Sequence, residues 1–300
     1  MKRFRQPQGV APASPDGDIP VGVTPRRIRR FTDHGSLWVD AVIVIEEPLE
    51  IRVEGRAVAV LMRTPGMEKE LAAGFVLGEG LVGELSQIAL IRHCGRAVAE
   101  EDAENDPLDE SRNLVDVRLL PGATQPLNKD QQPFSVQLIR SGCGRTDATM
   151  LAQDLPSVDS EIKIPLDVLE RLPGQMTRQQ AAYRAAGGVH ASAVFDSKGR
   201  RIVVCEDIGR HNAVDKALGY CLLRGTALED KLLVSTGRAS SDMVAKGTRL
   251  GLPIIASISS PTSLAIELAE SLNCTLLGYL RGKSLNVYTH GWRITQAQHF

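Results

Sequence analysis

The stretch KLLVSTGRASSDMVAKGTRLGLPIIASISSPTSLAIELAESLNCTLLGYL, residues 231–280, decides the fold, because short apolar runs alternate along it with longer amphipathic ones. The runs 231–235, 253–257 and 275–280 are rich in branched apolar residues, which is typical of buried strands. The runs 242–250 and 263–271 lie between them and have helical spacing. Strands that alternate with helices of this length predict a mostly parallel sheet covered on both faces.

The residues before this stretch extend the same domain. Two strand-like runs, 189–195 and 201–205, flank the turn 196–199 and predict a hairpin. A helix is expected over 176–186 and another over 212–223. We therefore predict an α/β chain whose C-terminal domain, residues 161–300, is a three-layer α/β/α structure.

The first half of the chain predicts a smaller domain. Strand patterns cover 37–62, 88–91 and 114–120, and an amphipathic helix is expected over 67–82. We assign a β-rich α+β domain to residues 26–135 and a loop segment carrying Cys143 to residues 136–160. Residues 1–25 are rich in proline, glycine and charge, and are expected to form a disordered tail.

Composition excludes several classes of protein. The formal net charge is -1 and aromatic residues make up 4% of the chain, which argues against nucleic-acid binding. No apolar run approaches the roughly 20 residues that a membrane helix needs, and no secretory signal follows the basic start. The five cysteines are an odd number without the spacing of a disulfide framework. A reducing, cytoplasmic location is expected.

Three strand-to-helix junctions carry residues suited to anion binding: 206–212, 235–241 and 259–263. Small residues, hydroxyls and free backbone N–H groups at helix starts bind phosphate, and arginine adds bidentate contacts. Ordinary helix capping explains any one junction alone, but three junctions with two arginines favour a phosphate or nucleotide site. The candidate residues are Arg210, His211, Gly237, Arg238, Ser260 and Thr262.

Two further segments carry candidate chemistry. Cys143 lies between glycines, and Arg140 and Arg145 nearby would favour its reactive thiolate form. The other four cysteines lie in apolar or helical contexts and are expected to pack in the core. After the last strand, Arg281 and Lys283 would neutralise phosphate, although a plain surface turn explains them equally well.

Histidines do not complete a metal site in the sequence. His190 begins a His-Ala-Ser string in which the glutamate of zinc deaminases is missing, and the chain has no Pro-Cys-x-x-Cys. No metal is therefore expected. His190 is interpreted as a structural or pocket residue, and His211 as the better functional histidine.

Several long strings resemble the formate dehydrogenase accessory sulfurtransferase family. They are GGVHA at 187–191, EDIGRHNAVDK at 206–216, SPTSLA at 260–265 and NVYT at 286–289. The strings RTPG at 63–66 and FVLGEG at 75–80 resemble the first domain of that family. The resemblance covers roughly residues 36–292.

The resemblance implies a homodimer with a C-terminal domain similar to the cytidine-deaminase fold. It implies that sulfur passes from a cysteine desulfurase, through a persulfide on Cys143, to bis-molybdopterin guanine dinucleotide, which then serves formate dehydrogenase. The cofactor-binding stretch of the family falls on Tyr279, Leu280, Arg281, Gly282, Lys283 and Ser284.

The sequence departs from the family pattern at one position, because Thr146 stands where the second cysteine of a Cys-x-x-Cys motif is common. Carriage of a persulfide needs one sulfur only, so that role for Cys143 survives the change. Two alternatives stay open: a chaperone that holds the cofactor without carrying sulfur, and a zinc deaminase, against which the missing ligands count.

Overall fold

The computed structural model describes residues 19–93, 110–123 and 148–296. Its N-terminal part contains a hairpin of β1 (Val23–Thr32) and β2 (Gly35–Val44), and a four-stranded sheet in the order β4-β3-β6-β5. The strands of this sheet are β3 (Glu47–Val53), β4 (Arg56–Arg63), β5 (Ile88–His93) and β6 (Leu114–Leu119). Helix α1 (Glu68–Gly78) covers one face of the sheet and packs Leu71 and Phe75 into its core. Short 3-10 turns lie at Leu85–Gln87 and Glu110–Asn113.

A six-stranded sheet organises the C-terminal part, in the order β13-β12-β11-β10-β8-β9. Its strands are β8 (His190–Asp196), β9 (Arg201–Asp207), β10 (Lys231–Ser235), β11 (Ile254–Ser257), β12 (Thr275–Arg281) and β13 (Ser284–Val287). The helices are α2 (Ala148–Ala152), α3 (Leu166–Thr177), α4 (Ala181–Ala186), α5 (Arg210–Leu223), α6 (Ser241–Arg249) and α7 (Ser263–Ser271). β7 (Ile164–Pro165) pairs with β14 (Ile294–Thr295), just after the 3-10 turn Gly291–Arg293.

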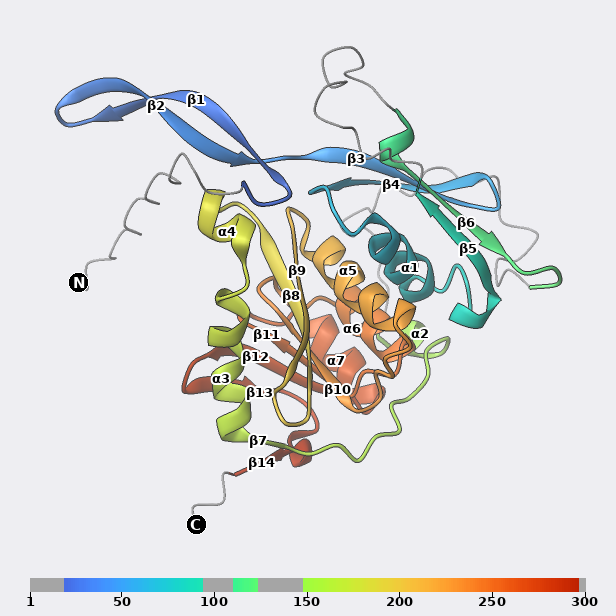
Figure 1. Ribbon diagram of the computed structural model, residues 1–300. Helices are drawn as coiled ribbons and strands as arrows, with labels where there is room; N and C mark the ends of the chain where they lie inside the picture. The colour runs from blue at the N-terminus through green and yellow to red at the C-terminus, as the bar shows by residue number, and fades with distance from the viewer. Residues whose placement is uncertain (1–18, 94–109, 124–147, 297–300) are drawn as a thin grey trace.

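Helices cover both faces of the six-stranded sheet, as the three-layer prediction requires. Helices α5, α6 and α7 bury residues such as Val214, Val244 and Leu268 against one face. Helix α3 buries Leu169 and Leu172 against the other. Figure 1 shows that α5 lies between the six-stranded sheet and α1. The four-stranded sheet lies on the far side of α1 and forms an outer layer of the molecule.

Two glycines allow α1 and α5 to approach closely. A Cβ atom built on Gly74 would lie 1.9 Å from the Asp215 carbonyl oxygen, and one built on Gly219 would lie 1.9 Å from the Glu70 carbonyl oxygen. Any larger side chain would force the helices apart, because such distances are far inside van der Waals contact. The two domains are therefore joined backbone to backbone.

Several predicted boundaries differ from the structure. The sheet is mixed, since β10, β11 and β12 are parallel while β8, β9 and β13 join antiparallel. The helix expected over 176–186 is two helices, α3 and α4, because α3 runs through Pro173 and ends at Thr177. The expected tail 1–25 overlaps β1, whose first residue Val23 is buried against α4.

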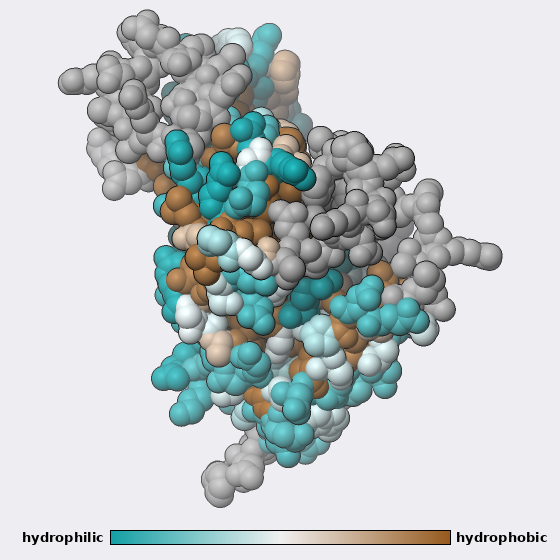
Figure 2. All heavy atoms as spheres, turned by 90° about the vertical axis from the view of Figure 1, so that its right-hand side faces the viewer, coloured by the Kyte–Doolittle hydropathy of each residue, from teal (hydrophilic) through white to brown (hydrophobic). Residues whose placement is uncertain are grey.

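The segment 148–160, expected to be loop, packs on the C-terminal domain. Helix α2 contacts α7, Val158 is buried in the core, and its N–H donates to the carbonyl oxygen of Leu272. Among the described residues, no helix is long and apolar enough to span a membrane. Figure 2 views the side that carries α1, β5 and β6, where hydrophobic surface is broken up by hydrophilic residues.

Candidate functional site

The carboxyl ends of four strands meet at one edge of the six-stranded sheet. β9 ends at Asp207, β10 at Ser235, β11 at Ser257 and β12 at Arg281. His190 lies at the same edge, because β8 starts there and pairs His190 with Asp207. Ligands of α/β sheets bind beyond this end of the strands. The three junctions singled out in the sequence all leave the sheet here.

Backbone hydrogen bonds lock the second and third junctions together. The N–H of Ala239 donates to Ser260 O at 3.2 Å, and the N–H of Thr262 donates to Ala239 O at 3.0 Å. The N–H of Tyr279 donates to Ser259 O at 2.9 Å. The loops that carry Gly237, Arg238 and Ser260 therefore form one connected rim with the end of β12.

Buried hydroxyls support this rim from below. Ser257 Oγ donates to Gly237 O at 2.6 Å and accepts from the N–H of Ser259 at 2.9 Å. Ser235 Oγ accepts from the N–H of Gly237 at 3.2 Å. Both serines are fully buried, so their hydroxyls serve the loops and are not available to a ligand. No sequence pattern marks Ser235 and Ser257 as supports of the loops.

Arg210 begins α5 and lies across the second junction. A Cβ atom on Gly237 would lie 2.7 Å from the Cβ of Arg210, so only glycine lets the arginine side chain pass. The Nε–H of Arg210 is buried and has no hydrogen-bond partner among the described residues. A buried donor without a partner costs about 1–3 kcal/mol, so an acceptor oxygen placed at this point of the rim would be favourable.

Two histidines flank Arg210, and both are neutral at pH 7. Burial and the Arg210 guanidinium lower the pKa of His190, whose Nδ1 lies 3.2 Å from Thr236 Oγ1. Burial, Arg210 and Lys246 lower the pKa of His211 to about 4, and its Nε2 lies 3.2 Å from Ser240 Oγ. Neutral imidazoles donate and accept hydrogen bonds without adding charge. The positive charge at this point therefore comes from arginine.

The stretch 279–284 divides into residues with different environments. Tyr279 has a left-handed φ of 52° at a register shift between β12 and β13. Arg281 is exposed, its Nε donates to Ile258 O at 3.0 Å, and its guanidinium carbon lies 5.6 Å from the centroid of the Tyr279 ring. Gly282 and Lys283 form the exposed turn between the two strands, and Ser284, also exposed, begins β13.

Two predicted site residues, Leu280 and Thr262, have structural roles instead of facing the rim as ligand contacts. Leu280 is fully buried in the core beneath α3, so its side chain faces away from the rim. The Thr262 hydroxyl accepts from the N–H of Ala265 at 3.3 Å and caps α7. The left-handed residue Tyr279 and the register shift around it explain the first, because they interrupt the alternation of β12 and place Leu280 on the same face as Leu277. Helix capping, which the sequence left open, explains the second.

Much of the string 206–216 joins the two domains instead of lining the rim. Asp207 accepts from the N–H of Thr64 at 3.2 Å and lies 2.7 Å from Lys216 Nζ. Lys216 also donates to Thr64 O at 2.8 Å, and Asn212 donates to Met62 O at 2.7 Å. This joint has no signal of its own in the sequence, because residues that join two domains and residues that bind a ligand can form the same kind of motif.

The described cysteines have packing roles, as predicted. Cys205, Cys221 and Cys274 are buried in the core between the six-stranded sheet and its helices. Burial raises the pKa of the Cys205 thiol, and raises the pKa of Cys221 and of Cys274 to about 12, so all three are protonated thiols at neutral pH. Cys94 and Cys143 lie outside the described residues.

In the described part of the chain, no group of three or more His, Cys, Asp and Glu side chains could hold a metal ion. His190 hydrogen-bonds Thr236, in keeping with the structural or pocket hydrogen-bonding role expected of it.

Comparison with known proteins gives a consistent result. Residues 44–295 match the model of the FdhD/NarQ family. The chain is 38% identical to the sulfur carrier protein FdhD of Mycobacterium tuberculosis over 274 residues, which cover 90% of this chain and 98% of the relative. It is 36% identical to the protein of that name from Saccharolobus solfataricus, over 89% of this chain and 98% of the relative.

A solved structure has the same fold. The crystal structure of a "putative formate dehydrogenase accessory protein" from Desulfotalea psychrophila superposes with a TM-score of 0.69 at 26% identity. The match covers 92% of this chain and all of that chain.

Proposed function

Because this chain belongs to the FdhD/NarQ family, we propose that it is a sulfur carrier that serves the maturation of formate dehydrogenase. Its relatives carry the name of that activity. We further propose that the sulfur acceptor is bis-molybdopterin guanine dinucleotide, bound as cargo at the rim of the six-stranded sheet. Relatedness supports the first statement, and the geometry of the rim supports the second.

The unpartnered Nε–H of Arg210 is the observation that carries the cargo site. A phosphate oxygen of a nucleotide is an acceptor that such a donor fits well. Backbone N–H groups at the starts of α5, α6 and α7 converge on the same edge and favour an anion. Arg238 and Arg281 are exposed on its loops and would bind further phosphate charge.

Cys143 is the proposed sulfur carrier. Its thiolate takes the sulfane sulfur from a persulfide of a cysteine desulfurase, which leaves the donor cysteine as a thiolate. The terminal sulfur of the new Cys143 persulfide would then pass to the cofactor as a neutral sulfur atom. The S–S bond breaks with its electron pair left on Cys143, which returns to a thiolate, and the reduced metal of the cofactor would supply the two electrons that convert the transferred atom to a sulfide. The support for this step is the glycine-flanked, arginine-neighboured sequence around Cys143 and the family to which the chain belongs.

Some parts of the proposal rest on the family resemblance alone. These are the desulfurase as donor, the cytoplasmic location, the homodimer and the likeness of the C-terminal domain to cytidine deaminases. Formate dehydrogenase as client is further supported by the relative of known structure, which is named as its accessory protein.

Mass spectrometry and nucleotide binding test the two halves separately. Incubation with a desulfurase and cysteine should add one sulfur, about 32 Da, to the peptide that contains Cys143. GDP should raise the melting temperature, because a ligand that binds only the folded state stabilises it. GDP binding without any sulfur adduct would favour the cofactor chaperone.

A further inference from the structure

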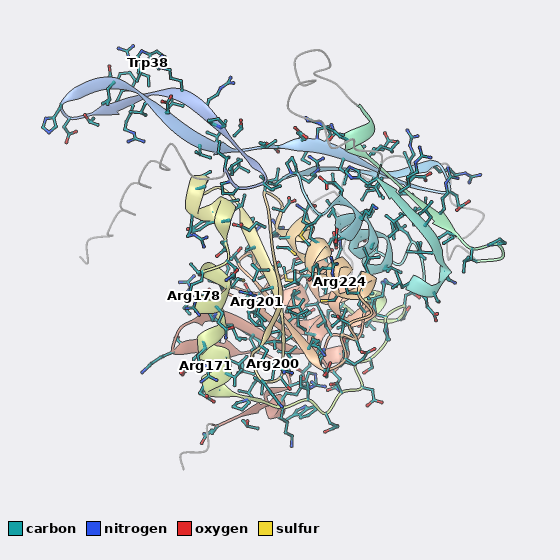
Figure 3. All side chains as sticks on the ribbon, in the orientation of Figure 1. Trp38, Arg171, Arg178, Arg200, Arg201 and Arg224 are labelled. Carbon is teal, nitrogen blue, oxygen red and sulfur yellow. The ribbon has the colours of Figure 1, made fainter. Side chains whose placement is uncertain are left out.

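The β1–β2 hairpin forms an arm that projects from the body of the protein (Figure 1). Its two ten-residue strands pair in continuous register from Val23↔Val44 to Thr32↔Gly35. Among the described residues, the arm packs on the body at its base, where Val42 and Val44 contact α4. Trp38 and Phe31 are 60% and 72% exposed near the tip, and Figure 3 shows Trp38 far from the two sheets. An isolated two-stranded hairpin is marginally stable in water, so the arm requires a partner.

The register identifies the backbone groups that are free on each edge of the arm. The N–H of Ile45 donates to Gly22 O at 2.9 Å, so Gly22 and Ile45 form a hydrogen-bonded pair. Hydrogen-bonded pairs alternate with open pairs along an antiparallel ladder. The even-numbered residues of β1 and the odd-numbered residues of β2 therefore bond within the arm. The outward groups belong to Pro25, Arg27, Arg29 and Phe31 on β1, and to Ser36, Trp38, Asp40 and Val42 on β2.

These two edges differ in their capacity to accept another strand. On β1, Pro25 lacks an N–H group, and Arg27 and Arg29 carry charge at the next two outward positions. Prolines and charged side chains are the devices that block pairing at an edge. On β2, every outward residue has an N–H group and Asp40 bears the only charge. Hydrogen-bond partners for residues 36–40 beyond the arm itself are absent from the described structure.

We propose that β2 pairs antiparallel with β2 of a second copy of this chain, across a two-fold axis at Trp38. Trp38 is the middle of the free segment 36–40, so this register joins each Trp38 to its counterpart and each Asp40 to Ser36. The two arms then form one four-stranded sheet, in which a β1 strand forms each outer edge. Sheets of three or more strands have the stability that an isolated hairpin lacks.

Side-chain chemistry favours a second copy as the occupant. The two Trp38 rings would face each other as a cross-strand aromatic pair, which is a stabilising arrangement. The Arg27 guanidinium carbon lies 5.8 Å from the Trp38 ring centroid, so a cation already lies beside each tryptophan. Asp40 would lie beside Ser36 of the other copy. Within each arm, the Ser36 hydroxyl accepts a hydrogen bond from Arg29 Nε at 3.1 Å. The contact is self-complementary and closed, as two-fold interfaces are.

This inference assigns a surface to the homodimer, and to that extent it rests on the proposed function. It is independent of sulfur transfer and of cofactor binding. Failure of the arm and failure of the proposed chemistry can therefore be told apart.

Light scattering on the full chain tests the proposal with two matched variants. Trp38→Lys places like charges opposite each other on β2. At roughly 20–50 μM protein, well above a micromolar Kd, it should convert the wild-type dimer to monomer. Phe31→Lys makes the same charge change on the same face but at the β1 edge, and should leave the dimer intact. A monomeric wild type would overturn both the arm contact and the family homodimer. A dimer that survives Trp38→Lys, or dissociates equally with Phe31→Lys, would overturn the arm contact alone.

Cross-linking supplies a test that does not depend on disrupting the arm. A hydrogen-bonded antiparallel pair places its Cα atoms about 5.5 Å apart, within the range that a disulfide spans. Trp38→Cys should therefore form a reducible covalent dimer under mild oxidation, and Phe31→Cys should not. Absence of the Trp38→Cys dimer, or an equal yield from both variants, would contradict the proposed register.

Discussion

The ammonium of Lys216 lies 2.7 Å from the carboxylate of Asp207, and both side chains are buried where the two domains meet. Both groups also bond the backbone of Thr64, so one ion pair fixes the first domain on the second. Because Asp207 ends β9 and Arg210 starts α5, this joint also sets where the arginine of the rim lies.

Replacing Lys216 with Met should therefore destabilise the protein strongly. Removal of one member of a buried pair leaves the other charge uncompensated, at a cost of about 3–5 kcal/mol. Arg200→Met is the control, because its pair with Asp196 is exposed on the arginine side and should contribute about 0–1 kcal/mol. Chemical denaturation of both variants measures the difference. Equal, small losses of stability would show that the joint tolerates an unpaired carboxylate.

Alanine at Gly219 should disrupt the contact between α1 and α5. Its Cβ would lie 1.9 Å from the Glu70 carbonyl oxygen, so the helices would have to separate at a cost of about 1–3 kcal/mol or more. Gly174→Ala is the matched control in α3, where the nearest atom is the flexible Arg178 Nη1 at 3.7 Å. That change should be neutral or stabilising by about 0.5–1 kcal/mol, because glycine weakens a helix interior. Thermal melts would decide, and a stable Gly219→Ala variant would refute the close approach.

Much of the second domain could be predicted from sequence, because burial on both sides of a strand gives an unambiguous pattern. The expected strand 231–235 is β10 residue for residue, and the helix expected over 212–223 is α5 with two further residues at its start. Helix α3 was missed over most of its length, since Pro173 and Gly174 look like a helix end. Burial of Leu169, Leu172 and Met176 maintains the helix there.

The first strand of the arm and the finer site assignments could not be predicted, for physical reasons, whereas the strand pattern at 37–62 covers most of β2. The arginine-rich residues 26–30 lack an apolar alternation, so no pattern marked them as a strand. The register of β12 against β13 decides which of its side chains face the rim. The register shift beside Tyr279, which places Leu280 in the core, depends on this strand pairing and not on the local sequence. The unpartnered Nε of Arg210 depends on residues far apart in the chain and has no sequence signal.

Arg210→Ala should weaken GDP binding while the protein remains folded. A hydrogen bond to a charged group contributes about 1.5–3 kcal/mol, which corresponds to roughly a tenfold to hundredfold loss of affinity. Arg281→Ala should act in the same direction. Arg201→Ala removes an exposed arginine at the opposite end of β9 and should leave the affinity unchanged. Calorimetric titration of the three variants is the measurement, and equal affinities throughout would exclude the rim as the nucleotide site.

His211 should make stability depend on pH below neutrality. Its folded pKa of about 4 lies below the ordinary value of 6.5, so between these values the unfolded chain binds a proton that the folded chain does not. Stability is therefore fully present above pH 6.5 and is lost as the pH falls toward 4, by about 2–3 kcal/mol for this group. His211→Gln should flatten that part of the profile relative to wild type. Identical profiles from pH 7 to 4.5 would show that His211 is not held neutral.

Cys143→Ser is the most specific test of the proposed chemistry, because a hydroxyl of similar size cannot form a persulfide. The variant should fold, bind GDP like wild type, acquire no sulfur from a desulfurase and fail to activate formate dehydrogenase in a complementation assay. Cys221→Ala removes a buried, protonated thiol instead, and should lower stability while sulfur loading and activation persist. Thr146→Cys should leave activation unchanged or mildly improved, since it adds a second thiol without altering the carrier. If Cys143→Ser activates fully while GDP binding persists, the protein holds the cofactor without carrying sulfur, and the chaperone alternative becomes the correct one.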